Sequence, residues 1–161
     1  MGHTDIPLNQ NGLDQAFQAA GFLKNIQFDR IISSPLSRAL KTAEIIAEQK
    51  QASVHVADEF KECSMGILEG EILLFDSRVQ LWEKGACVEN AELYHDFSKR
   101  VVQGLAQALS GSEIPLIVSH GGVYRIIQIA LGLPHQGIKN CVPIFHKPVE
   151  QLDGVWDIQV L

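Results

Sequence analysis

Along the first half of the chain, segments with apolar residues three or four positions apart alternate with short continuous apolar runs. The predicted elements are helices at 9–24 and 34–49 and strands at 28–33 and 54–57. Asn9 and Ser34 are suitable helix caps, and Pro35 suits a first turn. The apolar face expected for the first helix consists of Leu13, Ala16, Phe17, Ala20 and Leu23. Alternating strands and helices are typical of a parallel sheet with crossover helices.

The second half of the chain continues this alternation and adds a terminal ribbon. The predicted elements are an irregular stretch at 58–70, a weak helix at 73–84, a stronger helix at 92–110, a strand at 114–118 and a helix at 123–131. Two last strands, at 142–145 and 155–160, can pair antiparallel with Asp153 and Gly154 turning between them. We therefore predict a single α/β domain over residues 1–161, with three layers (α/β/α), a mainly parallel sheet and an antiparallel edge.

Composition narrows the class of protein. The 161 residues are 46% hydrophobic and carry a formal net charge of −6, which suits one domain and argues against nucleic acid as a partner. No apolar run approaches the roughly 18–20 residues that cross a bilayer, so no membrane partner is expected. The cysteines Cys63, Cys87 and Cys141 are odd in number and widely spaced, which indicates neither a disulfide framework nor a zinc site. We expect a cytoplasmic protein without a metal or cofactor.

Polar residues follow two of the predicted strands, at joins that belong to the same rim of a parallel sheet. His120 ends a buried run and is followed by Gly121 and Gly122, an arrangement that can hold an anion at the start of a helix. Arg38 lies in the first turn of its helix, where a cation is unfavourable unless something negative is near. Taken singly, His120 could equally cap a turn and Arg38 could be an ordinary solvated arginine.

Taken together, several segments resemble one known family. They are Asp5-Ile6-Pro7-Leu8-Asn9, Gly12, Gln15-Ala16, Ser33-Ser34-Pro35-Leu36-Ser37-Arg38-Ala39-Leu40-Lys41-Thr42-Ala43, Glu62 with Gly66 and Glu69-Gly70, and Ser119-His120-Gly121-Gly122. In this order and over nearly the whole chain, they resemble the histidine phosphatase superfamily, the phosphoglycerate mutase-like group.

The resemblance implies a role for each matching position. Arg38 resembles the arginine that grips the phosphoryl group, His120 the histidine that hydrogen-bonds this group in the transition state, and Glu62 the acid that protonates the leaving oxygen. It also implies phosphate-binding positions at Arg38, Gly2, Gly121 and Gly122. Such a site needs cations, N–H donors and an acid, and no metal. A thiol mechanism at Cys63 is excluded because no Cys-x5-Arg loop follows it.

The family's hallmark, an Arg-His-Gly motif at the end of a first, central strand, does not occur in this chain. The chain opens with residues that resemble the segment after that motif, and His3 matches a loop position. A missing central strand would leave buried main-chain groups unpaired, at about 1–3 kcal/mol each. We favour a chain that is incomplete at its amino end. The alternative is a short form in which neighbouring strands close up or a partner supplies a strand.

The expected function is hydrolysis of a small phosphorylated metabolite through a phosphohistidine that this chain cannot form alone. Phosphoglycerate mutase activity is the alternative, disfavoured because the region between Glu69 and Glu92 is short. A further alternative is phosphate binding without catalysis. Val155 and Trp156 of the terminal ribbon belong either to the core or to the edge of a homodimer.

Overall fold

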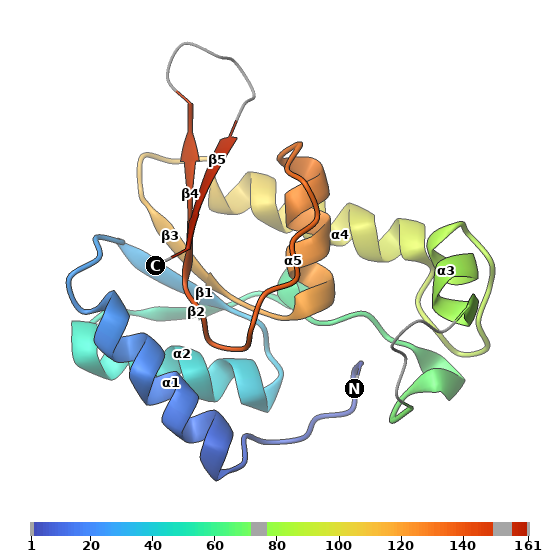
Figure 1. Cartoon of the computed structure of the whole chain (residues 1–161), viewed down its shortest axis with the longest axis horizontal. Coiled ribbons are helices and arrows are strands. Elements are labelled where there is room, and N and C mark those ends of the chain that lie inside the picture. Colours follow the sequence, from blue (N-terminus) through green and yellow to red (C-terminus); the bar gives the residue numbers. More distant parts are fainter. Residues whose placement is uncertain (1, 72–76, 150–155, 161) are drawn as a thin grey trace.

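The computed structural model describes residues 2–71, 77–149 and 156–160 (Figure 1). The helices are α1 (Gln10–Leu23), α2 (Ser37–Lys50), α3 (Ser77–Glu83), α4 (Tyr94–Ala108) and α5 (Gly121–Ala130), with short 3-10 turns η1 (Asp58–Phe60) and η2 (Gly66–Leu68). The strands are β1 (Arg30–Ser33), β2 (Val54–Val56), β3 (Pro115–Val118), β4 (Ile144–Pro148) and β5 (Trp156–Val160). Among these described residues, no helix is both long enough and apolar enough to cross a membrane.

A three-stranded parallel sheet, in the order β2-β1-β3, forms the middle layer. Because successive side chains of a strand point to opposite faces, Ile31 packs with α1 and α2 while Ile32 packs with α4 and α5. Figure 1 shows α1 and α2 together on one side of the sheet and α4 and α5 on the other. The predicted three-layer α/β/α fold with a parallel sheet is confirmed.

The antiparallel ribbon is also present, but it is a separate sheet. β4 pairs with β5, with Ile144 opposite Val160, and neither strand pairs with β3 within the described residues. The neighbouring strands have therefore not closed up. Trp156 packs against the core on the α4–α5 side. Val155, the Asp153-Gly154 turn and residues 73–76 of the predicted third helix lie outside the described residues.

Three helices begin elsewhere than the sequence predicts, and of these α4 starts at Tyr94, two residues later than expected. The α2 helix starts at Ser37 instead of near Ser34, because the Ser34 hydroxyl accepts a bond from the Leu36 amide (3.3 Å) within the turn before the helix. The α5 helix starts at Gly121, two residues early, with His120 at its N-cap position. In α1, Asn9 caps the helix as predicted, but Phe17 is about half exposed. Residues 34–36, between β1 and α2, thus form a short turn held by the Ser34 hydroxyl.

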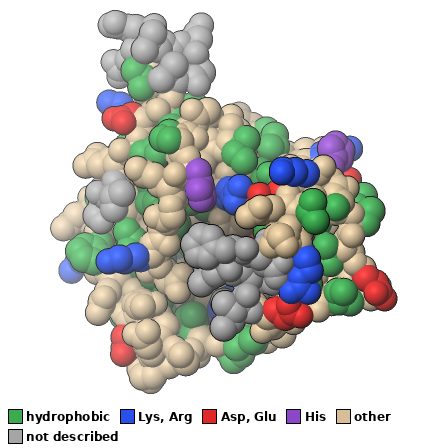
Figure 2. Space-filling model, turned by 45° about the vertical axis from the view of Figure 1, so that its right-hand side comes forward, with side chains coloured by type: hydrophobic (Ala, Val, Ile, Leu, Met, Phe, Trp, Pro, Cys, Tyr) green, Lys and Arg blue, Asp and Glu red, His purple; other side chains and the backbone are tan. Residues whose placement is uncertain are grey.

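Charged side chains of both signs are interspersed on the face of the molecule shown in Figure 2. This mixture agrees with the modest net charge of −6 over the whole chain. A surface of this kind produces no strong field of one sign over that face, so selective attraction of an anion there depends on local groups.

Candidate active site

The carboxyl ends of β1 and β3 place their following residues side by side. The amide of Ser34 donates to the carbonyl oxygen of Val118 (3.0 Å), which extends the pairing of the two strands by one residue. A hydrogen bond of 2.7 Å then joins Oγ of Ser34 and Nε2 of His120. Ser34 is fully buried. The two joins that the sequence placed at one rim are therefore in direct contact.

The imidazole of His120 is neutral near pH 7. Burial, together with the positive charges of Arg38 and Arg100 and the nearby His3, lowers the pKa of His120 to about 3. An imidazole in this state can offer one N–H and one lone pair to a ligand or neighbour. Its position at the N-cap of α5 directs it toward the rim where ligands of α/β folds bind.

The carboxylate of Glu62 lies at the N-terminus of α5. Its Oε2 accepts a hydrogen bond from the amide of Gly122 (3.1 Å), and its Oε1 accepts one from the amide of Cys63 (3.0 Å). A Cβ atom added at Gly122 would overlap Oε1 of Glu62 and lie 3.1 Å from its Cδ, whereas one added at Gly121 would meet no described atom within 4 Å. The Glu62 carboxylate can approach this closely only because residue 122 is a glycine, whereas residue 121 does not need to be one.

The guanidinium of Arg38 holds the amino-terminal segment. Its Nη1 donates to the carbonyl oxygen of Thr4 and its Nη2 to that of Gly2, both at 3.0 Å. The negative group expected beside this helix start is Asp5, whose Oδ1 accepts from the amide and the hydroxyl of Ser37, each at 2.8 Å. These hydrogen bonds lower the pKa of Asp5. Arg38 and Asp5 together tie residues 2–5 to the start of α2.

Glu69 holds the same segment from the opposite side. Its carboxylate accepts from the amides of His3 and Thr4, both at 2.8 Å, from the Thr4 hydroxyl, and from the amide of Met65 at 3.4 Å. Burial acts to raise the pKa of Glu69, but these bonds outweigh it and lower the pKa. Gly2 has a φ of +49°, and a Cβ there would lie 2.5 Å from Oε1 of Glu69. A side chain at position 2 would therefore push the carboxylate away.

A cavity of about 340 Å³ lies beside these groups. Its lining includes four of the six predicted site residues, Gly2, Glu62, Gly121 and Gly122, together with the apolar side chains of Met65, Trp82, Phe97 and Ile126. Arg125 also faces it and is paired with Glu83 (2.8 Å). The remaining two predicted residues, Arg38 and His120, are next to the lining without forming part of it. Arg38 binds the carbonyl of Gly2, and His120 precedes Gly121.

The Cys63 thiol lies in this site but is not placed as a nucleophile. Burial, followed by the charge of Glu62, raises the pKa of the Cys63 thiol, which keeps it protonated and unsuited to nucleophilic attack. Within residues 2–71, 77–149 and 156–160, no three side chains of His, Cys, Asp or Glu gather as metal ligands would. The reactive groups placed by the structure are thus an imidazole, a carboxylate and a guanidinium.

Two residues that support the site were not predicted from the sequence. Arg100 and Glu92 form a hydrogen-bonded ion pair (2.7 Å), and Arg100 also donates to the carbonyl oxygen of Glu62. Their separation of eight residues matches neither the three- nor the four-residue spacing of helical pairs, and Glu92 lies before α4 begins. The other acceptors of Arg100 are main-chain carbonyls, which no pattern of side chains reveals. Glu69 had been singled out only as part of the Glu69-Gly70 segment of the family resemblance, and the sequence did not indicate which groups it contacts.

Comparisons with known proteins show which family this chain is similar to. A model of the histidine phosphatase superfamily (branch 1) matches residues 1–143. The chain is 32% identical over 163 residues to an uncharacterized phosphatase, PhoE, of Bacillus subtilis (strain 168), covering 98% of this chain and 82% of that protein. It is 33% identical over 156 residues to a probable phosphoglycerate mutase, GpmB, of Proteus mirabilis (strain HI4320), covering 87% of this chain and 73% of that protein. The alpha-ribazole phosphatase from Shigella flexneri has a similar fold, with a TM-score of 0.79 at 24% identity over 99% of this chain and 86% of that chain.

Proposed function

This chain belongs to the histidine phosphatase superfamily, and from that premise we propose that it forms the active site of a phosphomonoesterase acting on a small phosphorylated metabolite. The observation that carries the proposal is the convergence at α5. The neutral His120, the carboxylate of Glu62 and the amide of Gly122 meet there beside a cavity. Helix N-termini favour phosphate groups, and an acid beside the cavity can serve the leaving group.

In the proposed reaction, a histidine nitrogen attacks phosphorus, the N–P bond forms, and the bond to the leaving oxygen breaks. Glu62 gives its proton to that oxygen. Water then attacks phosphorus, the N–P bond breaks, and the water proton returns to Glu62. His120 and Arg38 donate hydrogen bonds to the phosphoryl oxygens throughout. Arg38 has five N–H donors, so it can bind phosphate while it still holds Gly2 and Thr4.

This proposal requires a nucleophilic histidine in an Arg-His-Gly motif, which these 161 residues do not contain. A strand ending in this motif would lie between β3 and β4, each of which has an edge without a strand partner among the described residues. Two observations support this position. The four residues of β3 are half-buried although helices cover both faces of the sheet, and both ring nitrogens of His146 on β4 are buried with no hydrogen-bond partner among the described residues. Such groups are costly unless they are paired.

Transfer of the phosphoryl group between positions of a phosphoglycerate is the second candidate. It is favoured by the 33% identity to the probable mutase of Proteus mirabilis. The two reactions share the phosphorylated histidine and differ in the group that accepts the phosphoryl. Release of inorganic phosphate, compared with formation of an isomeric phosphoglycerate, distinguishes them.

Binding of orthovanadate to the purified chain, followed by calorimetry, tests the pocket without requiring turnover. Arg38→Ala removes a charge-assisted donor and should weaken binding roughly 10- to 100-fold. Lys41→Ala is the matched control, because Lys41 lies on the same helix and pairs only with Glu44 on the surface among the contacts found for it. An Arg38→Ala variant that binds vanadate as the Lys41→Ala variant does would place the anion site elsewhere.

A further inference from the structure

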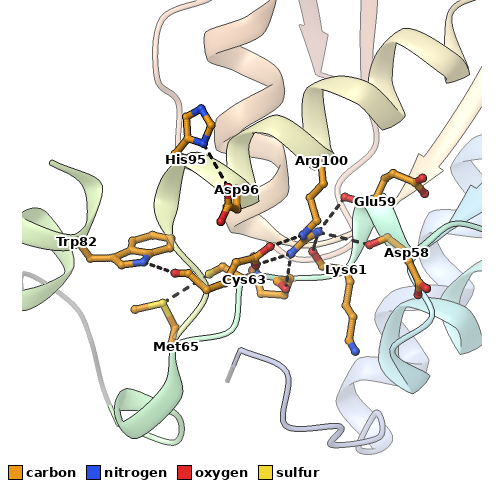
Figure 3. Close-up of polar contacts among 11 residues, drawn as sticks. Asp58, Glu59, Lys61, Cys63, Met65, Trp82, His95, Asp96 and Arg100 are labelled. Carbon is orange, nitrogen blue, oxygen red and sulfur yellow. Dashed lines mark hydrogen bonds and ion pairs between the residues drawn. The ribbon is translucent and has the colours of Figure 1, made fainter. Parts of the chain in front are cut away.

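The guanidinium of Arg100 on α4 lies against the main chain that leads to Glu62 (Figure 3). Its Nη1 donates to the carbonyl oxygens of Lys61 (2.7 Å) and Glu59 (2.9 Å), with a longer contact to that of Asp58 (3.4 Å). Its Nη2 donates to the carbonyl oxygen of Glu62 itself (3.0 Å). One side chain therefore binds four main-chain carbonyls between Asp58 and Glu62, including that of the proposed acid itself.

Glu92 holds Arg100 in this orientation. Its Oε1 accepts from Nε of Arg100 (2.7 Å) and its Oε2 from Nη2 (2.9 Å), the paired arrangement that suits a planar guanidinium and a carboxylate. The two side chains are only 22% and 20% exposed, so solvent screens the pair less than it would on the surface. Arg100 also lies over the ring of Phe97, 4.9 Å from its centroid. These contacts leave Arg100 few alternative rotamers.

The main chain of Glu92 fixes the other end of the same segment. The amide of Glu92 donates to the carbonyl oxygen of Ser64 (3.0 Å), two residues after Glu62. The carbonyl oxygen of Glu92 accepts from Nε1 of Trp82 (2.6 Å), a buried side chain that lines the cavity. The segment that carries Glu62 is thus held on both sides by a single ion pair and its main chain.

We propose that Arg100, locked by Glu92, is the positioning residue that keeps the Glu62 carboxylate at the N-terminus of α5. Glu62 reaches the Gly122 amide only if its own main chain stays in place, and Arg100 binds that main chain directly. Arg100 acts through geometry as well as charge, because its fork makes several separate bonds that an ammonium group cannot reproduce. The inference rests on the proposed function only in naming Glu62 the acid.

Hydrogen exchange at the Gly122 amide, followed by NMR, measures this positioning without catalysis. The first amides of a helix have no acceptor within the helix, so protection of Gly122 depends on the Glu62 carboxylate. Glu62→Ala defines the full loss of protection. We expect Arg100→Gln and the charge-retaining Arg100→Lys each to accelerate exchange at Gly122 roughly 10- to 100-fold. Exchange at the Leu131 amide, bonded to Ile127 at the far end of α5, should change little.

Arg30→Gln is the matched control, because Arg30 also donates to a main-chain carbonyl, that of Ala108 (2.9 Å) at the carboxyl end of α4, away from Glu62. It should leave exchange at Gly122 as in the original chain. Equal acceleration at Gly122 and Leu131 in the Arg100 variants would show a general loss of stability and overturn the proposal. So would Gly122 exchange that is unchanged in Arg100→Lys. Because no turnover is measured, either result is independent of whether the chain is a phosphatase.

Discussion

The adjacent glycines that open α5 give a sharp test of where the Glu62 carboxylate lies. Gly122→Ala adds a methyl group that would overlap Oε1 of Glu62, while Gly121→Ala adds the same group into open space. Neither glycine has a positive φ. The two substitutions therefore change the chain equally and differ in the neighbour that the new Cβ meets.

The expected magnitudes follow from two opposing effects. Alanine in a helix is favoured over glycine by about 0.5–1 kcal/mol, so Gly121→Ala should be neutral or slightly stabilising. At Gly122 the flexible carboxylate must move away, which loses a hydrogen bond to a charged group worth about 1.5–3 kcal/mol. The net loss of unfolding free energy for Gly122→Ala should be about 1–2 kcal/mol. In a chain of this length, this corresponds to a fall in Tm of roughly 2–8 °C.

Urea unfolding of both variants and of the original chain measures these differences directly. A double variant, Glu62→Ala with Gly122→Ala, completes a cycle in which the cost of the new methyl group should disappear because nothing remains for it to displace. Equal stability of Gly121→Ala and Gly122→Ala would refute the reasoning. A cost at Gly122 that persists without Glu62 would show that another neighbour causes it.

Two further predictions concern other parts of the same site. The pKa of His120 is about 3 in the folded chain and 6.5 in the unfolded chain, so protons bind preferentially to the unfolded chain and stability falls as the pH drops below about 6.5. Urea unfolding at pH 7 and pH 5 measures this loss of unfolding free energy, which His120→Gln should reduce by about 2 kcal/mol. An unchanged pH dependence would contradict the burial of this imidazole. Gly66 has a φ of +53°, and a Cβ added there would overlap a main-chain carbonyl oxygen. Gly66→Ala should therefore lower the unfolding free energy, measured by thermal melts, by more than about 2 kcal/mol. Gly85→Ala, at a φ of +96° and with no described atom within 4 Å of the new Cβ, should show the smaller cost of backbone strain alone.

Much of the fold was predictable because hydrophobic periodicity determines which faces are buried. The alternation of strands and helices identified the parallel sheet, and the opposite burial of Ile31 and Ile32 follows from strand geometry. The start of α2 was predicted wrongly. Ser34 has the composition of a helix cap, but its hydroxyl bonds within the preceding turn and to His120, a partner 86 residues away. Such a tertiary contact is invisible to local propensity.

The sequence predicted which residues form the candidate site, but it did not predict the contacts that hold them in place. The motifs brought attention to Glu62, Arg38 and His120, and the structure places all three around the ends of β1 and β3. The sequence contained no sign that Arg100 binds main-chain carbonyls near Glu62, because carbonyls occur at every residue. Nor did it indicate that Arg38 binds the carbonyls of residues 2 and 4. Contacts to the main chain depend on the fold alone.

The proposed function requires that this chain binds the phosphoryl group through Arg38 and His120 and that the nucleophile is a histidine in an Arg-His-Gly motif, which the 161 residues lack. Hydrolysis of p-nitrophenyl phosphate by the purified chain, compared with its His120→Ala variant, tests it most directly. The predicted result is no turnover by either protein, and turnover sensitive to His120→Ala once a strand ending in Arg-His-Gly is joined to the chain. Hydrolysis by the 161-residue chain alone that is lost in His120→Ala would contradict the account, since the nucleophile would then lie within it.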